Sequence, residues 1–326
     1  MSEDRPALDL TEQTGRAPGE RLARAFFFAC AAVSVLTTLG IVVALGSGAM
    51  RFFDVTAAFG NAVGLFDYGR ETVGVLEFLG GTSFSPGQGE FGVLPLVSGT
   101  LMITFGSALI ALPLGVGTAI YLSEFASERR RRYLKPALEV LAGVPTVVYG
   151  FFAIAYITPV IEGTTGVDLG LFNALSASIV VGIMIIPMVA SVSEDAMSAV
   201  PDDLRQAGYG MGATRFDVAT GIVVPAAISG IASSFILGLS RAIGETMAVT
   251  IAAGRTPKLL NPLAPGAYTE SIQTMTAAMV GLASGDISGL GVEYHSIFGI
   301  GVTLFLITFV MNLVSDWIAT RYREAY

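Results

Sequence analysis

Two oppositely charged residues, Arg241 and Glu245, interrupt one of the most apolar stretches of this 326-residue chain. They belong to the sequence LSRAIGETMA, near the middle of a segment that would span a membrane roughly over residues 228–251. Each ionised group at that depth costs about 2.5 to 3.5 kcal/mol, so something must compensate. A spacing of four residues places both side chains on one face of a helix, where they can pair or line one wet surface.

The chemistry that such a pair can perform is the reversible binding of an oxyanion. Arg241 offers a planar, permanently charged fork, while Glu245 positions it and lowers the net field, so that a bound anion is released again. The alternative is a salt bridge that only neutralises itself, but arginine preceding glutamate is the less favourable order for such a pair. Thr146 and Tyr149 in GVPTVVYG could face the same substrate pathway, although a proline-kinked helix packed through glycine explains them equally well.

Membrane-spanning helices must position these side chains, and the composition predicts them. Apolar residues make up 53% of the chain and charged residues 13%, with a mean hydropathy of +0.69, which excludes a soluble enzyme. About 20 residues suffice to cross the hydrocarbon core. We therefore predict an all-α membrane protein with six transmembrane helices, from the uncharged stretches 25–46, 91–123, 140–161, 169–193, 218–240 and 296–315.

Polar segments divide the chain between these helices. Residues 1–24 are expected to form a disordered cytoplasmic tail, and the apolar run 25–46 is longer than a cleavable signal core, so it is expected to be a retained helix. An extracytoplasmic loop follows at 47–90, and a membrane core extends over 91–320 with a second outer loop at 255–294. Within that loop, the uncharged run SIQTMTAAMVGLASG is too short to span and favours an external or re-entrant helix.

The distribution of basic residues predicts the orientation. With the N-terminus inside, thirteen lysines and arginines fall on the cytoplasmic side and four on the opposite side, so both termini are expected to be cytoplasmic. The outer loops would then carry ten acidic residues. This acidic face argues against nucleic acid as a partner and against general attraction of anions. An anionic cargo would have to be delivered by another protein.

Several chemical functions are excluded by inspection. Cys30 and His295 are the single cysteine and histidine, so neither a metal site nor another cofactor is expected. A phosphate-cradling loop needs Gly-Lys-Ser or Gly-Lys-Thr, but Lys135 follows leucine and Lys258 follows proline. The chain is therefore expected not to be an enzyme, and any ATP hydrolysis would come from a partner.

A cytoplasmic segment at 193–225 contains the most informative motif. Pro201 followed by two aspartates, including Asp203, is a strong helix start, because proline fits the first turn and acids suit the positive end of the helix dipole. The closely spaced glycines from Gly208 to Gly212 are expected to end this helix. A second short amphipathic piece then leads back into the membrane.

This segment resembles the EAA loop of ABC-importer permeases, whose pattern is E-A-A, three residues, G, nine residues, I-x-L-P. Gln206, Ala207, Gly208 and Gly212 match its spacing, with glutamine replacing the glutamate and one charge lost, and IVVP at 222–225 closes the pattern. In that family, the loop forms a coupling helix seated in the ATP-hydrolysing subunit. The residues to which the resemblance implies this role are Asp203, Gln206, Ala207, Gly208, Gly212 and Arg215.

More of the chain is similar to the phosphate-transporter permeases of the PstC type. The residues that carry this are GTAIYLSEFA at 117–126, LKPALEVLAGVPTVVYGFFA at 134–153, GMGATRFDVATGIVVPAAISGI at 210–231 and LGLSRAIGETMAVTIAAG at 237–254. The resemblance implies the type I ABC importer permease fold, with 91–320 as the permease core. It also implies a multi-pass protein of a prokaryotic cell membrane that moves inorganic phosphate into the cytoplasm.

The same resemblance implies partners: a homologous second permease of the PstA type, two copies of an ATP-binding subunit of the PstB type, and an extracytoplasmic phosphate-binding protein of the PstS type. Membrane lipid is a further partner, because the basic run at 129–132 suits anionic headgroups.

Two alternative functions stay open. One is a secondary oxyanion transporter or channel without an ATPase, in which Glu245 couples protons; the other is an ABC permease for sulfate or molybdate.

Overall fold

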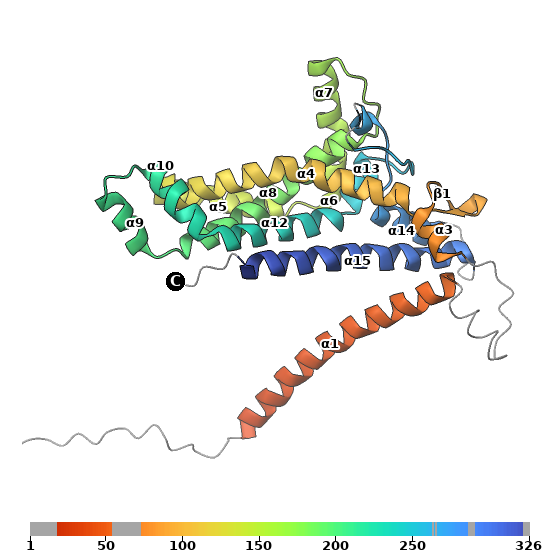
Figure 1. The fold of residues 1–326 in the computed structure, drawn as a ribbon, viewed down its shortest axis with the longest axis horizontal. Coiled ribbons are helices and arrows are strands. Elements are labelled where there is room, and N and C mark those ends of the chain that lie inside the picture. Colours follow the sequence, from red (N-terminus) through yellow and green to blue (C-terminus); the bar gives the residue numbers. More distant parts are fainter. Residues whose placement is uncertain (1–17, 54–72, 263, 265, 286–290, 322–326) are drawn as a thin grey trace, which may run out of the picture.

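The computed structural model describes residues 18–53, 73–262, 264, 266–285 and 291–321. The predicted tail falls largely outside these residues, as do 54–72 of the first outer loop and 286–290 of the second. Among the described residues, the regular elements are helices apart from one short hairpin (Figure 1). Its elements are α1 (Pro18–Phe52), α3 (Val75–Gly80), β1 (Phe84–Ser85), η1 (Pro86–Gln88), β2 (Glu90–Phe91), α4 (Leu94–Ile120), η2 (Tyr121–Phe125), α5 (Glu128–Ala142), α6 (Thr146–Phe152), η3 (Ala153–Ile157), α7 (Thr158–Thr165), α8 (Ala174–Ser198), α9 (Asp202–Gly210), α10 (Arg215–Val218), η4 (Ala219–Val223), α11 (Val224–Ala226), α12 (Ile228–Ile243), α13 (Met247–Ala252), η5 (Ala267–Thr269), α14 (Met275–Ser284) and α15 (Val292–Arg321).

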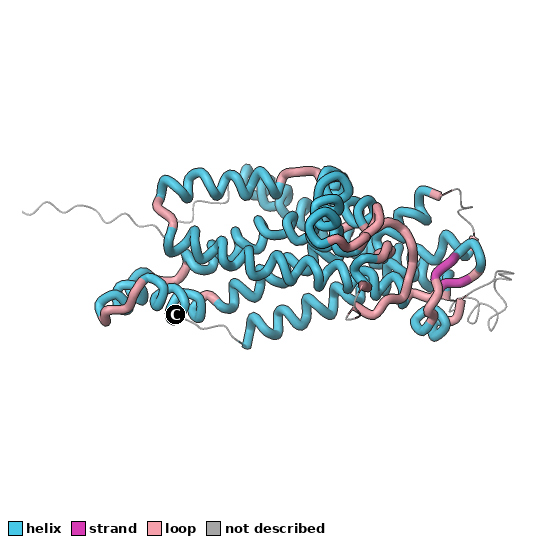
Figure 2. Tube along the Cα trace, turned by 90° about the horizontal axis from the view of Figure 1, so that it is seen from above, coloured by secondary structure: helices cyan, strands magenta, loops and turns pink. Residues whose placement is uncertain are grey.

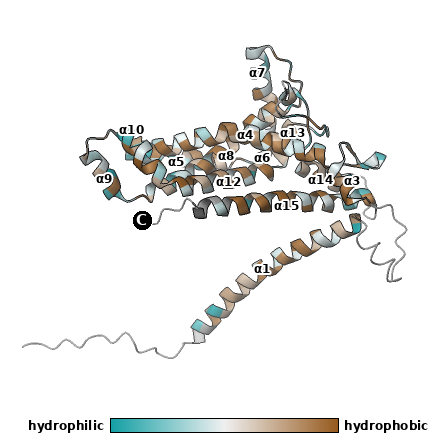
Figure 3. Cartoon of the chain, viewed as in Figure 1, coloured by the Kyte–Doolittle hydropathy of each residue, from teal (hydrophilic) through white to brown (hydrophobic). Residues whose placement is uncertain are grey.

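Five helical stretches of the described chain are long and apolar enough to cross a membrane, or six if one bent pair counts as a span. The six predicted spans therefore correspond to real elements, with shifted boundaries. The first is longer than predicted, since α1 already begins at Pro18 and continues to Phe52. Hydrophobic residues lie on every side of these helices, while hydrophilic ones appear at the start of α1 and in α9 and α10 (Figure 3).

Two span predictions were wrong in their boundaries. The third was drawn from residue 140, but α5 occupies that position and ends at Ala142, so the span begins only at Thr146 after the Gly143–Pro145 break. The fifth is not one helix: Arg215–Ala226 and Ile228–Ile243 meet at a bend of 72°. The break lies at Ala227, whose φ of −90° and ψ of 4° are not helical, two residues after Pro225.

Close packing of α4 against α8 forms the centre of the molecule. A Cβ atom at Gly115 would lie 2.6 Å from the Cγ1 of Val189, and one at Gly182 would lie 3.1 Å from the carbonyl oxygen of Ser107. Small residues at such positions let two helix backbones approach, which is how helices associate where lipid removes the hydrophobic driving force. Buried residues of α4, α6, α8 and α13 surround this contact, so one hydrophobic core joins helices from the first and the second half of the sequence.

The connecting segments gather at two opposite ends of the bundle. α9, α10 and the end of α15 lie at one end, and α1 starts on that side too (Figure 1). The hairpin of β1 and β2 lies at the other end, close to α3 and α14 (Figure 2). This arrangement places the segments predicted as cytoplasmic together. Which end faces the cytoplasm stays a prediction.

The part of the first outer loop that the structure describes is packed. Phe52 lies edge to face with Phe78 at 5.3 Å between ring centroids and with Phe91 at 5.7 Å. All three are buried, and edge-to-face rings stabilise such clusters beyond the area that they bury. The cluster ties the end of α1 to α3 and to the hairpin.

The short apolar run in the second outer loop forms an inserted helix. α14 is ten residues long, which corresponds to about 15 Å and is too short to span. Its first turn is buried, and the backbone N–H of Met275 donates to the Oγ1 of Thr100 at 3.0 Å. The run is therefore a short helix and not a span, as predicted, while its placement as an external or a re-entrant helix stays a prediction.

A cluster of ion pairs joins α5 to the end of α8. The Glu194 side chain is 1% exposed, accepts a hydrogen bond from the Nζ of Lys135 at 2.7 Å, and also pairs with Arg131. The hydrogen bond to Glu194 raises the pKa of Lys135 above its usual value. Its stabilising contribution is therefore complete at neutral pH and is lost only as the pH rises through that raised pKa.

We expect Glu194→Ala to lower the free energy of unfolding by about 2 kcal/mol, less than a fully buried pair would lose, because the two cations keep access to solvent. The measurement is the thermal unfolding midpoint of the purified chain in detergent. The matched control is Asp195→Ala, since the Asp195 side chain is 69% exposed and lies 3.5 Å from the same Lys135 ammonium. Equal midpoints for the two variants would contradict this prediction.

Candidate functional site

The predicted ion pair lies at a break between two helices. α12 ends at Ile243, Gly244 follows as its C-cap, and α13 starts at Met247. Across this break, the Nη1 of Arg241 lies 3.0 Å from the Oε2 of Glu245. The pair therefore forms as predicted, but the expectation of one continuous helix over 228–251 was wrong.

Glu245 also holds the broken ends in place. Its Oε1 accepts a hydrogen bond from the backbone N–H of Ala248 at 3.1 Å, which satisfies one of the free donors at the start of α13. Its backbone carbonyl accepts a hydrogen bond from the Oγ1 of Thr276 in α14 at 2.8 Å. One residue thus connects α12, α13 and α14. This explains how the backbone groups freed at the helix break find partners inside the protein.

The two partners differ strongly in accessibility. The Glu245 side chain is 2% exposed, whereas that of Arg241 is 42% exposed. A guanidinium carries five N–H donors, and the contact with Glu245 involves only one of its nitrogens. The remaining donors on the exposed side can form a forked interaction with an oxyanion. Glu245, in contrast, is placed to orient the arginine rather than to meet a ligand.

Polar residues that the sequence analysis missed lie next to this arginine. The Oγ of Ser240 donates to the Oδ1 of Asn312 at 3.4 Å, a weak bond that connects α12 to α15. Asn312 is exposed in this isolated subunit, although it lies within the apolar helix α15. An asparagine within a predicted span was the signal that could have identified it, because polar side chains there usually face a partner or a water-filled path.

Tyr149 and Thr146 occupy different environments. Tyr149 is buried in the same core as Ala242 and Ala248, and its hydroxyl donates to the carbonyl of Leu141 at 2.8 Å. Thr146 is half-buried at the start of α6. The phenol of Tyr149 therefore has a structural partner in this conformation. A role for either residue in the substrate pathway stays a prediction.

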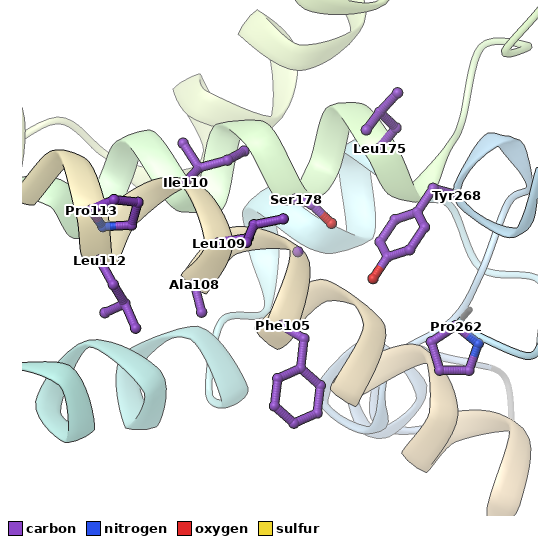
Figure 4. A pocket seen from close by; sticks show the side chains of 11 residues that line it. Phe105, Ala108, Leu109, Ile110, Leu112, Pro113, Leu175, Ser178, Pro262 and Tyr268 are labelled. Carbon is purple, nitrogen blue, oxygen red and sulfur yellow. The ribbon is translucent and has the colours of Figure 1, made fainter. Parts of the chain in front are cut away.

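An apolar cavity of about 770 Å³ lies between α4, α8 and the loop before α14 (Figure 4). Its polar side chains are the hydroxyls of Ser178 and Tyr268, and that of Ser178 is buried without a hydrogen-bond partner. An oxyanion would lose its hydration here without gaining a positive charge. This cavity is therefore a poor anion site despite its size, which leaves Arg241 as the candidate.

The segment from α9 through α10, residues 202–218, forms the second candidate surface. Pro201 caps α9, and Asp202 and Asp203 lie in its first turn, as predicted. α9 ends at Gly210, within the glycine-rich stretch that was predicted to end it, while Gly208 is still helical and is buried against Val218 and Ile222. Helix packing explains this glycine, since a Cβ there would lie 2.6 Å from the Cδ1 of Ile222.

The turn between α9 and α10 depends on Gly212. Its φ of +85° lies in the left-handed region that favours glycine, as the motif spacing suggested. Thr214 and Asp217 then form a capping box that starts α10. The turn presents two strongly exposed apolar side chains, Met211 at 89% and Phe216 at 65%.

The residues assigned to coupling are brought together on this segment. All of them lie at its surface except the buried Gly208. The sequence analysis missed the exposed Met211 and Phe216, although large apolar residues in a polar segment were a usable signal. The exposed set consists of Asp203, Gln206, Ala207, Gly212 and Arg215.

Within residues 18–53, 73–262, 264, 266–285 and 291–321, no three His, Cys, Asp or Glu side chains gather closely enough to hold a metal ion. The candidate surfaces are therefore an accessible arginine at a helix break and an exposed turn with apolar side chains.

Sequence comparisons relate the chain to known proteins. The profile of the family described as binding-protein-dependent transport system inner membrane component matches residues 111–324. The probable ABC transporter permease protein YqgH of Bacillus subtilis is 30% identical over 314 residues, covering 96% of this chain and 94% of that protein. The phosphate transport system permease protein PstC of Mesorhizobium japonicum is 32% identical over 263 residues, covering 75% and 78%.

A structural comparison agrees with these relatives. The crystal structure of a bacterial alginate ABC transporter in complex with an alginate-bound periplasmic protein contains a chain that matches with a TM-score of 0.61. The match covers 95% of this chain and 99% of that chain at 15% sequence identity. At such an identity, the similarity concerns the fold alone.

Proposed function

The chain belongs to the family of binding-protein-dependent transport inner membrane components, and we propose that it is the PstC-type permease subunit of an ATP-driven importer of inorganic phosphate. It is a multi-pass protein of the cytoplasmic membrane with the type I ABC importer permease fold, as the sequence predicted. The substrate in the proposal follows the name of the PstC relative. The permease itself is not an enzyme, and a partner supplies ATP hydrolysis.

The observation that carries the transport proposal is the geometry of Arg241. Its guanidinium is tied to a nearly buried carboxylate and keeps an exposed side, at a break where α12, α13 and α14 meet. An arginine alone in a dry site would retain a phosphate dianion, whereas the neighbouring Glu245 reduces the net field. Discontinuous helices at membrane depth are a frequent way to build such ion sites.

The coupling role rests on the α9–α10 segment. Its exposed Met211 and Phe216 suit an apolar cleft on a partner, and Asp203, Gln206 and Arg215 surround them with polar groups. A buried apolar centre with a polar rim is the usual composition of a protein interface. The proposal assigns this surface to the ATP-binding subunit of the PstB type.

The full assembly in the proposal contains a second permease of the PstA type, two ATP-binding subunits and a PstS-type phosphate-binding protein on the outer side. The binding protein would deliver phosphate, because the acidic outer loops cannot attract it. The hairpin and the phenylalanine cluster give the outer end a folded surface for docking.

The deciding experiment is labelled-phosphate uptake by proteoliposomes that contain all proposed subunits, with and without ATP. The proposal expects ATP-dependent uptake that resists excess sulfate and molybdate. Uptake that instead competes with sulfate or molybdate would assign another oxyanion. Uptake by the chain alone, driven by a proton gradient, would identify the secondary transporter. The engagement of Glu245 with both Arg241 and Ala248 favours the importer over that alternative.

A further inference from the structure

Arg205 connects α9 to the ends of two central helices. Its Nη2 lies 3.2 Å from the Oε1 of Glu124, and its Nε donates to the same oxygen at 3.3 Å. The same Nη2 donates to the carbonyl of Met197 at 2.7 Å, and Nη1 donates to the carbonyl of Val200 at 2.5 Å and to the Oδ1 of Asp202 at 3.2 Å. One side chain therefore uses three of its nitrogens in a single cluster.

This cluster is largely shielded from water. The Arg205 side chain is 14% exposed and that of Glu124 is 4% exposed. Buried ion pairs of this kind lose much of their hydration, so their net stabilisation is small compared with their geometric specificity. We therefore interpret this ion pair as a contact that fixes one conformation, rather than as one that adds much to the free energy of unfolding.

The partners of Arg205 come from the core of the bundle. Glu124 belongs to η2, the π-helical turn that continues α4, and Met197 lies in the last turn of α8. α4 and α8 are the closely packed central pair, and α12 packs against both. π-helical turns are often found at functional positions. The arginine thus joins the proposed coupling segment to the helices that support Arg241.

The other contacts of the α9–α10 segment are mainly apolar packing, which is less directional than the hydrogen bonds of Arg205. Gly208 packs against Val218 and Ile222, which belong to the following part of the same segment and its continuation. Leu204 adds apolar contact to a cluster around Ala119 and Met197. A polar cavity of about 560 Å³ is lined by Glu124 of η2 on one side and by Tyr209 and Arg215 of the α9–α10 segment on the other.

We propose that Arg205 is the positioning residue that makes the α9–α10 segment move together with the ends of α4 and α8. A displacement that the ATP-binding partner imposes on α9 then reaches the α4–α8 pair and, through it, α12 and Arg241. Energetic coupling over such distances needs rigid elements joined by specific contacts. The inference rests on the proposed function, because it presumes that a partner displaces α9.

The geometry requires an arginine. Two backbone carbonyls and two carboxylates accept hydrogen bonds from the guanidinium, and its rigid fork of donors contacts all four. A lysine would keep the charge but offers one nitrogen on a flexible stem. Lysine is therefore expected to restore the link only in part, which distinguishes positioning from a requirement for positive charge.

The test compares Arg205→Met, Arg205→Lys and Glu124→Gln with the control Arg51→Met, which changes an exposed arginine in the last turn of α1. Fully assembled complexes in proteoliposomes are measured for phosphate uptake and for ATP hydrolysis in the same vesicles. We expect Arg205→Met and Glu124→Gln to reduce the phosphate moved per ATP by about tenfold, the loss typical of one charge-assisted hydrogen bond, with ATP hydrolysis per complex largely retained. Arg205→Lys should be intermediate, and the control should match the wild type.

Each other outcome overturns the inference. Uptake and hydrolysis that fall together, with an unchanged ratio, would show that the pair does not transmit motion. A wild-type ratio in Arg205→Met would show the same. Should Arg205→Met fail to assemble, the ratio for Glu124→Gln decides, and failure of both to assemble would assign the pair to folding. A wild-type complex without ATP-driven uptake would instead refute the proposed function, independently of Arg205.

Discussion

Replacing Arg241 by alanine is expected to lower ATP-driven phosphate uptake about 100-fold or more, since the variant loses a forked, charge-assisted contact with the anion. The variant would also leave the buried Glu245 carboxyl without its partner 3.0 Å away, which weakens the helix break that holds the site. Both effects act in the same direction. The measurement is the initial rate of labelled-phosphate uptake in membranes in which the amounts of all subunits are checked.

Arg241→Lys separates charge from geometry in this prediction. A lysine keeps the positive charge but lacks the planar fork, so we expect uptake between that of the wild type and that of Arg241→Ala. Lys258→Ala is the control, because it removes a half-exposed cation that pairs with Glu270 at 2.6 Å in the outer loop. Normal uptake by Arg241→Ala in fully assembled complexes would remove Arg241 from the substrate pathway.

Replacing Gly212 by valine is expected to abolish the association of the permease with its ATP-binding subunit. At a φ of +85°, a β-branched side chain is strained by roughly 1 to 3 kcal/mol, and the turn that presents Met211 and Phe216 would refold to relieve this strain. A steric clash is not the cause of this effect, because a Cβ at Gly212 would meet no atom within 4 Å. The measurement is the amount of ATP-binding subunit that co-purifies with the permease.

Gly210 provides a matched control for this effect. It lies two residues earlier, is helical, and a Cβ there would also meet nothing within 4 Å. Gly210→Ala should therefore keep the association, and Gly212→Asn should keep most of it, because asparagine tolerates the left-handed region. Equal co-purification of Gly212→Val and Gly210→Ala would show that the backbone conformation of this turn does not matter for coupling.

The helix break gives one physical explanation for both the ion pair and the glutamate's position. Ending a helix at membrane depth leaves backbone groups without partners, and these must be satisfied inside the protein. Glu245 satisfies the Ala248 N–H with one carboxylate oxygen and Arg241 with the other. The same carboxylate therefore stabilises the break and balances the charge of the proposed anion site.

Local features of the sequence determined much of this protein. Uncharged runs of about 20 residues predicted the spans, because the thickness of the hydrocarbon core sets that length. The four-residue spacing of Arg241 and Glu245 predicted their contact, and the motif position of Gly212 predicted a turn. Each of these depends on residues that are close in the chain, so the local sequence contains the necessary information.

Only the tertiary structure decided how those elements are interrupted and joined. The break after Ile243 depends on Thr276, which lies 31 residues beyond Glu245 and supports its carbonyl. Gly208 packs against Val218 and Ile222 only because the chain folds back after the turn, and Arg205 contacts Glu124 from 81 residues away. Such contacts are set by which helices pack together, and the backbone groups freed at a break can be satisfied only by whatever that packing brings near. Local propensity and residue spacing do not predict which residues become neighbours in the folded protein.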